Sequence, residues 1–270
     1  MSNSVNTNVS AIIALQSLNR TNAELDKTQK QVSTGFRVSD AADDGAAFAV
    51  AQGLRSMNKG YDAVGERLSA AKGLVSVASS GLQSISDTLG EARKVLTKLA
   101  DASLSASERS QYNADWDALQ VEATNFANQS SFNGVNLLVG TAATNIIYSA
   151  TGGTFTLTAQ DMAAKIVTGM GTVANATAAQ TLLSGAFATL EGQVGTSLST
   201  LGSYTRSITN QANFTSIISD ATTSGIGNIV DADLAKVSAR LQALQIRQQL
   251  GTQSLSIANQ APSALLSLFK

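Results

Sequence analysis

The sequence predicts a mainly α fold, an elongated antiparallel helical bundle or coiled coil that carries one small β-hairpin. Apolar residues recur in alternating steps of three and four through most of the chain, which is the spacing of a helix face wound against a partner helix. The single proline, Pro262, lies near the C-terminus, so almost nothing interrupts helices before it. One stretch, 145–158, changes to a period of two, which is typical of paired strands.

The composition excludes several kinds of function. The 270 residues include no cysteine, which rules out disulfides and thiolate metal sites, and no histidine, the commonest general base. The net charge of −1 gives no indication of a nucleic-acid partner. The N-terminus does not read as a secretory signal peptide, and no apolar run approaches the roughly 18 residues of a membrane span. We therefore expect no cofactor, no metal, no enzymatic activity and no nucleic-acid or membrane partner.

Residues 11–32 predict a first helix with a thin apolar seam. The seam keeps its spacing, but alanine and threonine occupy much of it, so it buries little area at about 25 cal/mol per Å². Such a helix is marginal in isolation.

An acidic cluster of Asp40, Asp43 and Asp44 follows and interrupts the pattern. Ser39 or Asp40 can cap the next helix, and the remaining carboxylates suit the positive end of its dipole. Because the aspartates lack the spacing of a calcium loop, we expect this structural role rather than a metal site.

A long helix is predicted from Ala47 to Leu99, and no residue on its repeating face is polar. At about 1.5 Å of rise per residue it is roughly 80 Å long, so the molecule should be elongated. Glycines at positions 53, 60, 65, 73, 81 and 90 are either tolerated surface positions or points of close approach by neighbouring molecules, and the sequence leaves both alternatives open. The expected core residues on the repeating face are Leu54, Tyr61, Leu68, Leu82 and Leu89.

A third helix should begin at the capping box formed by Ser105 and Glu108. Trp116 and Phe126 lie on its apolar face, and we expect them to pack in the core rather than to bind a ligand. Asn133 and Gly134 then form a turn signal.

The predicted hairpin turns at Gly152 and Gly153, which places Tyr148 opposite Leu157. Four apolar residues then share one face: Ile146, Tyr148, Phe155 and Leu157. We expect residues 160–180 to form a loop or variable segment.

A helical face resumes at Leu183 and should end at residues 224–227, lying antiparallel along the long helix. Its expected core residues are Leu190, Leu201 and Ile208. A last heptad run, 230–258, has soft positions at Gln248 and Gly251. Because an antiparallel bundle brings both termini to one end, we expect the first and last helices to pair.

Several separate motifs, in the correct order, make this chain resemble the bacterial flagellins over nearly its whole length. The matching stretches are residues 4–11, 18–19, 31–35, 40–44, 131–134, 257–262 and 265–268. The resemblance implies a secreted structural subunit that self-assembles into the flagellar filament for motility after export through the type III apparatus. There is no room for a large outer domain, so we expect a short form.

The resemblance also implies how the parts of the chain are used. Residues 1–40 and 228–270 would form a terminal coiled-coil domain in the filament core, and 41–227 would form the surrounding helical-bundle domain. The expected assembly residues are Ala11, Leu18, Leu25, Val32, Leu234, Leu241, Leu244 and Leu255. The implied partners are many copies of the chain itself, an export chaperone at the C-terminal segment, the filament cap and the hook–filament junction proteins. Thin seams predict termini that are mobile in the monomer and become ordered on assembly.

One motif of the family is degenerate in this chain. Flagellins recognised by Toll-like receptor 5 carry Gln-Arg-Val-Arg-Glu-Leu on the first long helix, whereas residues 90–95 read Gly-Glu-Ala-Arg-Lys-Val. The site equivalent consists of Glu91, Arg93, Lys94 and Val95. Glu91 and Lys94 each reverse a charge and Val95 shortens an apolar contact, so we expect weak or no receptor activation.

The sequence is compatible with two other functions. A hook–filament junction protein would share the terminal architecture, and self-seeded polymerisation would distinguish it. A secreted coiled-coil adhesin or binding module would instead stay a small oligomer under polymerising conditions.

Overall fold

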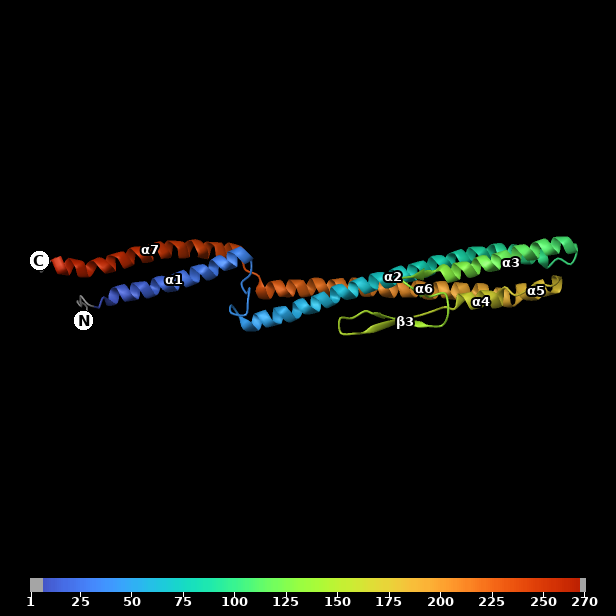
Figure 1. Cartoon of the computed structure of the whole chain (residues 1–270), viewed down its shortest axis with the longest axis horizontal. Coiled ribbons are helices and arrows are strands. Elements are labelled where there is room, and N and C mark those ends of the chain that lie inside the picture. The colour runs from blue at the N-terminus through green and yellow to red at the C-terminus, as the bar shows by residue number, and fades with distance from the viewer. Residues whose placement is uncertain (1–6, 268–270) are drawn as a thin grey trace. The chain divides into compact units, whose positions relative to one another are not determined.

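The computed structural model describes residues 7–267, so residues 4–6 of the first motif and Leu268 of the last lie outside the described residues. The chain forms two compact units, which we call the terminal unit (1–56 and 221–270) and the central unit (57–220). The fold is mainly α, as predicted, and Figure 1 traces its helices and hairpins.

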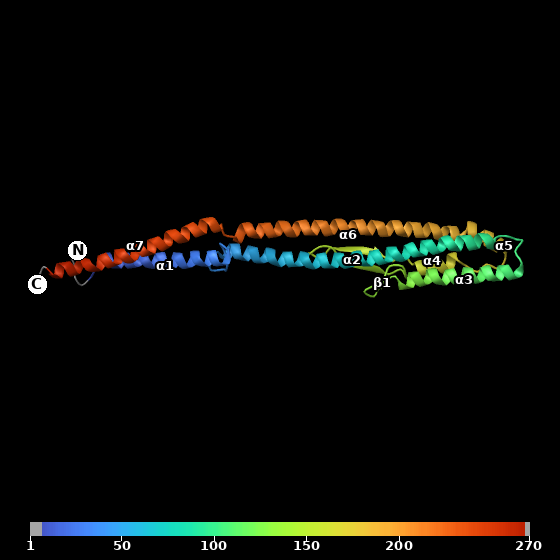
Figure 2. The ribbon, with the colours of Figure 1, turned by 90° about the horizontal axis from the view of Figure 1, so that it is seen from above.

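The core of the central unit lies along α2 (Gly45–Leu99), the predicted long helix. Every position of its repeating face from Val64 to Leu99 is buried, whereas Val50 and Met57, nearer its start, are exposed. α6 (Ala186–Val230) runs antiparallel to α2, because Ser219 hydrogen-bonds to Asn58 while Glu191, near the other end, pairs with Arg93. Figure 2 shows α2 and α6 side by side.

α3 (Ala106–Gln129) begins at the predicted capping box. The Ser105 N–H donates to the Glu108 carboxylate, and the Glu108 N–H donates to the Ser105 hydroxyl. Trp116 is buried, as expected for a core residue. Its ring centroid lies 5.6 Å from that of Phe187, and its indole N–H donates to the carbonyl of Gly171 at 3.1 Å. Burial of this large ring with a satisfied N–H ties α3 to the rest of the core.

Residues 160–180 do not form a loop, and this part of the prediction is wrong. They contain α4 (Met162–Gly169) and most of α5 (Ala176–Ser184). Met162 and Ile166 lie one turn apart and are both buried, while the Asn175 side chain caps α5 by accepting from the Ala178 N–H. Burial of single apolar residues among alanine and threonine stabilises these short helices.

The predicted hairpin forms, but with a different turn. β3 (Ala143–Ile147) pairs antiparallel with β4 (Thr154–Thr158), with Ile146 opposite Phe155. The strands are joined by a longer loop that closes with a bond from the Tyr148 N–H to the Gly153 carbonyl. Because the predicted register is displaced by an even number of residues, Ile146, Phe155 and Leu157 still share one face, whereas Tyr148 lies in the loop after β3.

A second, shorter ladder was not predicted. β1 (Ser131–Phe132) pairs with β2 (Val135–Asn136), and the expected turn at Asn133 and Gly134 joins them. This turn requires left-handed backbone, with φ of 50° at Asn133 and 78° at Gly134.

α6 does not end at residues 224–227, contrary to the prediction. It continues through Gly225 and Gly227 to Val230. Val230 is buried with Val38 and Ala51, and the half-buried Ile226 packs against this cluster. This burial outweighs the cost of two helical glycines, up to about 1 kcal/mol each. α7 (Leu234–Ser267) follows, and Asp233 caps it by accepting from the Lys236 N–H.

The glycines of α2 fall into two groups. A Cβ added at Gly60 or Gly73 would meet Ala150 or Phe132 at 3.1 Å, and one added at Gly81 would meet the Ser130 hydroxyl at 1.8 Å. Within the described structure a Cβ at the second group, Gly53, Gly65 and Gly90, would meet open space. The first group therefore allows the segment after α3 to approach the helix closely.

Gly81→Ala should destabilise the chain by about 1–3 kcal/mol, because Ser130 is buried and its hydroxyl already donates to the Phe126 carbonyl. Gly90→Ala, on the same helix but facing open space, should instead stabilise it by up to about 1 kcal/mol. Urea unfolding followed by circular dichroism measures both. A Gly81→Ala variant as stable as the wild type would contradict the close approach.

Candidate assembly interface

The two terminal helices pair antiparallel within the terminal unit, as Figures 1 and 2 show. α1 (Val9–Thr34) is capped at its N-terminus by Asn8, whose side chain accepts from the Ala11 N–H. Its C-terminal cap is Gly35, where φ is 74°. Near its start, Asn8 donates to the Ala258 carbonyl at 2.7 Å. Further along, a Cβ at Gly251 would lie 3.2 Å from Leu18.

Most of the expected assembly residues lie in the seam between these helices. Leu244 is buried, and six others are half-buried: Ala11, Leu18, Leu25, Val32, Leu241 and Leu255. Leu234 does not join them, because it is the first residue of α7 and is 50% exposed. The seam also buries Thr21 and Thr28, so it is less apolar than the face of α2.

The expected core residues mostly lie together in the central unit. The buried members are Leu68, Leu82, Leu89, Trp116, Leu190, Leu201 and Ile208. Phe126 is half-buried and packs against the same cluster. Tyr61 is half-buried, and Leu54, also half-buried, lies in the terminal unit.

A second apolar face of α7 was missed. Ile246, Leu250 and Ile257, which we call the outer stripe, are 59%, 62% and 63% exposed. Their spacing of four and seven places them on one side of the helix, away from the seam. That spacing is visible in the sequence, but assigning a single apolar face to the helix concealed it.

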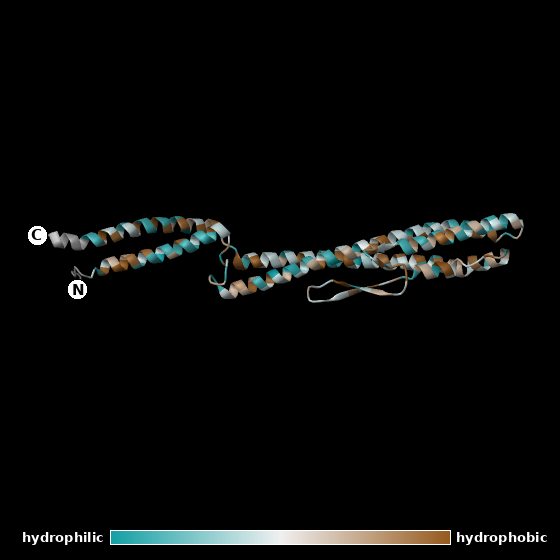
Figure 3. Ribbon diagram, in the orientation of Figure 1, coloured by the Kyte–Doolittle hydropathy of each residue, from teal (hydrophilic) through white to brown (hydrophobic). Residues whose placement is uncertain are grey.

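The start of α1 also exposes apolar side chains. Val9, Ile12, Ile13 and Leu15 are between 48% and 61% exposed, and Figure 3 shows hydrophobic colouring along these first turns. Exposed apolar residues gathered on paired helices are typical of a surface that another molecule covers.

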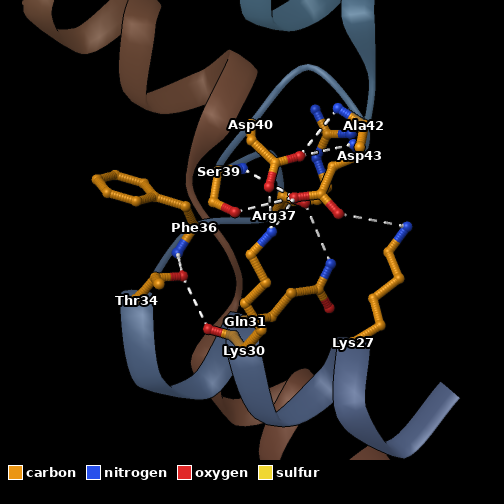
Figure 4. A network of polar contacts seen from close by, with 10 residues as sticks. All are labelled: Lys27, Lys30, Gln31, Thr34, Phe36, Arg37, Ser39, Asp40, Ala42 and Asp43. Carbon is orange, nitrogen blue, oxygen red and sulfur yellow. Dashed lines mark hydrogen bonds and ion pairs between the residues drawn. The ribbon is translucent and has the colours of Figure 1, made fainter. Parts of the chain in front are cut away.

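The loop between α1 and α2 has polar contacts that hold it in place (Figure 4). The Lys30 ammonium lies 2.5 Å from Asp40 and 3.2 Å from Asp43, while Asp40 also accepts from the Ala42 N–H. α2 is capped by Asp44, which accepts from the Ala47 N–H at 3.1 Å. The prediction that Ser39 or Asp40 caps this helix is wrong, because both side chains close the preceding loop.

The carboxylates of Asp40 and Asp43 are bonded within the loop and to Lys30 of α1. Among the described residues, no group of acidic side chains is arranged to hold a metal ion. The Ser39 N–H and hydroxyl donate to Asp43 and, with Lys30, lower its pKa to about 2. The hydrogen bond from Lys30 likewise lowers the pKa of Asp40 and raises that of Lys30.

The same loop is hydrogen-bonded to the end of α6. The backbone N–H groups of Arg37 and Val38 both donate to the Val230 carbonyl, at 2.7 and 3.2 Å, and Ala232 donates back to Gly35 at 2.9 Å. The Arg37 guanidinium also donates to the carbonyl of Ile229. The segment that follows α1 is therefore fastened to the segment that precedes α7.

The receptor-site equivalent is engaged in contacts within the chain. Arg93 binds Glu191 on α6 through two hydrogen bonds, one from its Nε at 2.8 Å. Lys94 pairs with Glu91 at 2.8 Å, and Val95 is half-buried.

Paired terminal helices that expose apolar side chains are typical of one class of protein, the self-assembling structural subunit. The family model of the bacterial flagellin N-terminal helical region matches residues 5–143, and that of the C-terminal helical region matches 185–269. The chain belongs to the bacterial flagellin family. It is a structural subunit that polymerises into the extracellular flagellar filament. None of its described helices has the length and apolarity to cross a membrane.

Curated relatives support this assignment over the whole length. Flagellin FljM of Caulobacter vibrioides is 36% identical over 274 residues, which covers 99% of each chain. A flagellin of Brucella melitensis is 33% identical over 287 residues, again 99% of each chain. Relatives matched from end to end agree with a short form that lacks large outer domains.

Asp43→Asn should lower stability near neutral pH but not in acid. Because the folded pKa of Asp43 is about 2 and its ordinary value is 3.8, the ionised group stabilises the folded chain above pH 3.8. That contribution is lost as the pH falls from 3.8 to about 2, so the wild type and variant should converge there. Urea unfolding across this range measures the difference, with exposed Asp87→Asn as control. A constant difference would contradict the assignment.

Proposed function

We propose that this flagellin, which has no enzymatic activity, builds the filament through its terminal helices. The α1–α7 pair, within residues 1–40 and 228–270, forms the inner core, and residues 41–227 form the shell. The single observation that carries this proposal is the outer stripe, because it leaves three large apolar side chains of α7 more than half exposed. Covering them with neighbouring copies removes this surface from water.

The composition of the seam supports the same proposal. Ordering a helix costs about 1–2 kcal/mol for each residue, and α1 and α7 contain 26 and 34 residues. Thr21, Thr28 and Gly251 occupy seam positions where larger apolar residues would bury more area. We infer that neighbouring subunits supply the remaining stabilisation and that the terminal helices become fully ordered on assembly.

The remaining partners follow from membership of the family. We infer export through the flagellar type III apparatus, a chaperone bound to the C-terminal segment before export, and contacts with the cap and junction proteins at the filament ends. The outer stripe supports the chaperone contact, since an exposed apolar face needs cover before assembly.

Replacing the outer stripe, Ile246→Ser with Leu250→Ser and Ile257→Ser, should prevent polymerisation. Burial of the exposed part of each side chain contributes about 1–2 kcal/mol, so the critical concentration should rise by roughly a hundredfold or more. Sedimentation of seeded protein and electron microscopy measure this, and circular dichroism checks that the helices remain.

Val121→Ser with Val167→Ser is the matched control, because these central-unit side chains are 59% and 56% exposed. This control should polymerise like the wild type. Polymerisation of the outer-stripe variant at the wild-type critical concentration would refute the proposal.

We further propose that the chain activates Toll-like receptor 5 weakly. The combination Glu91→Arg, Lys94→Glu and Val95→Leu restores the charges and size of the recognised motif and should raise potency by about tenfold or more. A reporter-cell assay with soluble protein measures both chains. Wild-type potency equal to that of a recognised flagellin would contradict the proposal.

A further inference from the structure

The small residues of the seam specify the register of α1 against α7 poorly. Thr21 and Thr28 are buried, but their hydroxyls donate to the Ser17 and Glu24 carbonyls of the same helix, at 3.0 and 2.7 Å. Their polar groups are therefore satisfied whatever lies opposite. A heptad seam of this kind can slide by seven residues, because that step brings the same face back to the partner.

Some polar contacts between the helices cannot prevent such a slide. Asn8 donates to the backbone carbonyl of Ala258, and an equivalent carbonyl exists at other residues of α7. Arg240 lies 3.5 Å from Glu24, but these side chains are 63% and 40% exposed, so water and salt weaken the pair.

The backbone bonds of Gly35 and Val38 to residues 230–232 hold only the ends of α1 and α7 that meet the loop. We propose that the hydrogen bond between Asn22 and Gln248 fixes the register along the rest of the α1–α7 pair. Gln248 Nε2 donates to Asn22 Oδ1 at 2.8 Å, and both side chains are half-buried. A slide of one heptad in either direction brings Leu241 or Leu255 to the place of Gln248. The Asn22 amide then loses its partner and faces a leucine, which is the way in which single polar residues select coiled-coil register.

Register matters because both helices expose apolar side chains. The positions of the exposed Ile12 and Ile13 on α1 relative to the outer stripe on α7 depend on the register of the pair. A slide of seven residues shifts one set against the other by about 10 Å. The register thus determines which surface is presented to neighbouring copies, and in this respect the inference rests on the proposed function.

Cysteine pairs can report the register directly, because the chain has no cysteine of its own. Ala11→Cys with Ala258→Cys reports the observed register, since these positions lie one heptad along each helix from the contact between Leu18 and Gly251. Ala11→Cys with Gly251→Cys reports a slide in one direction, and Leu18→Cys with Ala258→Cys reports the other. Mild oxidation of filaments, then non-reducing electrophoresis, separates disulfides within a chain from those between chains.

The wild-type chain and three variants of it receive these cysteine pairs. Asn22→Leu with Gln248→Leu removes the hydrogen bond while keeping similar side-chain size. Asn22→Gln with Gln248→Asn exchanges the two amides and retains the bond. Asn19→Leu with Gln249→Leu makes the same kind of change at exposed positions and serves as the matched control. A variant that does not sediment is oxidised as the soluble chain, so its register is still measured.

In the leucine pair, the ratio of observed-register to slid-register disulfides should fall by about tenfold, while the exchanged and control variants keep the wild-type ratio. A leucine pair with the wild-type ratio would overturn the register proposal and leave the proposed function intact. A tenfold lower ratio in the exchanged variant would also overturn the register proposal, since that variant retains the bond. Polymerisation of the outer-stripe variant bears on the proposed function alone.

Discussion

Along α2 the apolar repeat is buried at every position from Val64 to Leu99, and the other elements of the central unit pack onto that face. Large side chains such as Trp116 and Phe187 complete the core, so the repeat is satisfied within one chain. The terminal helices use the same spacing with smaller and more polar residues, and they also expose a second apolar face. The same apolar spacing is therefore buried within the chain in the central unit, whereas the terminal unit leaves apolar side chains exposed.

The sequence predicted the long helices well because the 3–4 repeat is local and each is many turns long. α4 and α5 were missed because two or three turns rich in alanine and threonine show little periodicity. The early end predicted for α6 followed from its glycines, yet burial of Ile226 and Val230 carries the helix past them. In such cases the burial of apolar side chains outweighs a local helix propensity that differs by about 1 kcal/mol.

The candidate interface was predictable only in part. Seam residues such as Leu18 and Leu244 follow from spacing, whereas Leu234 lies outside the seam because its helix begins there. The outer stripe was visible as a second spacing on α7. The bond between Asn22 and Gln248 joins residues 226 positions apart, and no local pattern indicates such a pairing. The fastening of Arg37 and Val38 to Val230 is likewise a product of tertiary structure.

The central claim is that the terminal helices reach full stability only when neighbouring subunits cover their outer faces. Amide hydrogen exchange, compared between the soluble subunit and the filament, tests it most directly. Protection in α1 and α7 should rise by a factor on the order of 100 on polymerisation, while protection in α2 from Val64 to Leu99 should change little. Equal protection of α1 and α7 in the soluble subunit and the filament would contradict it.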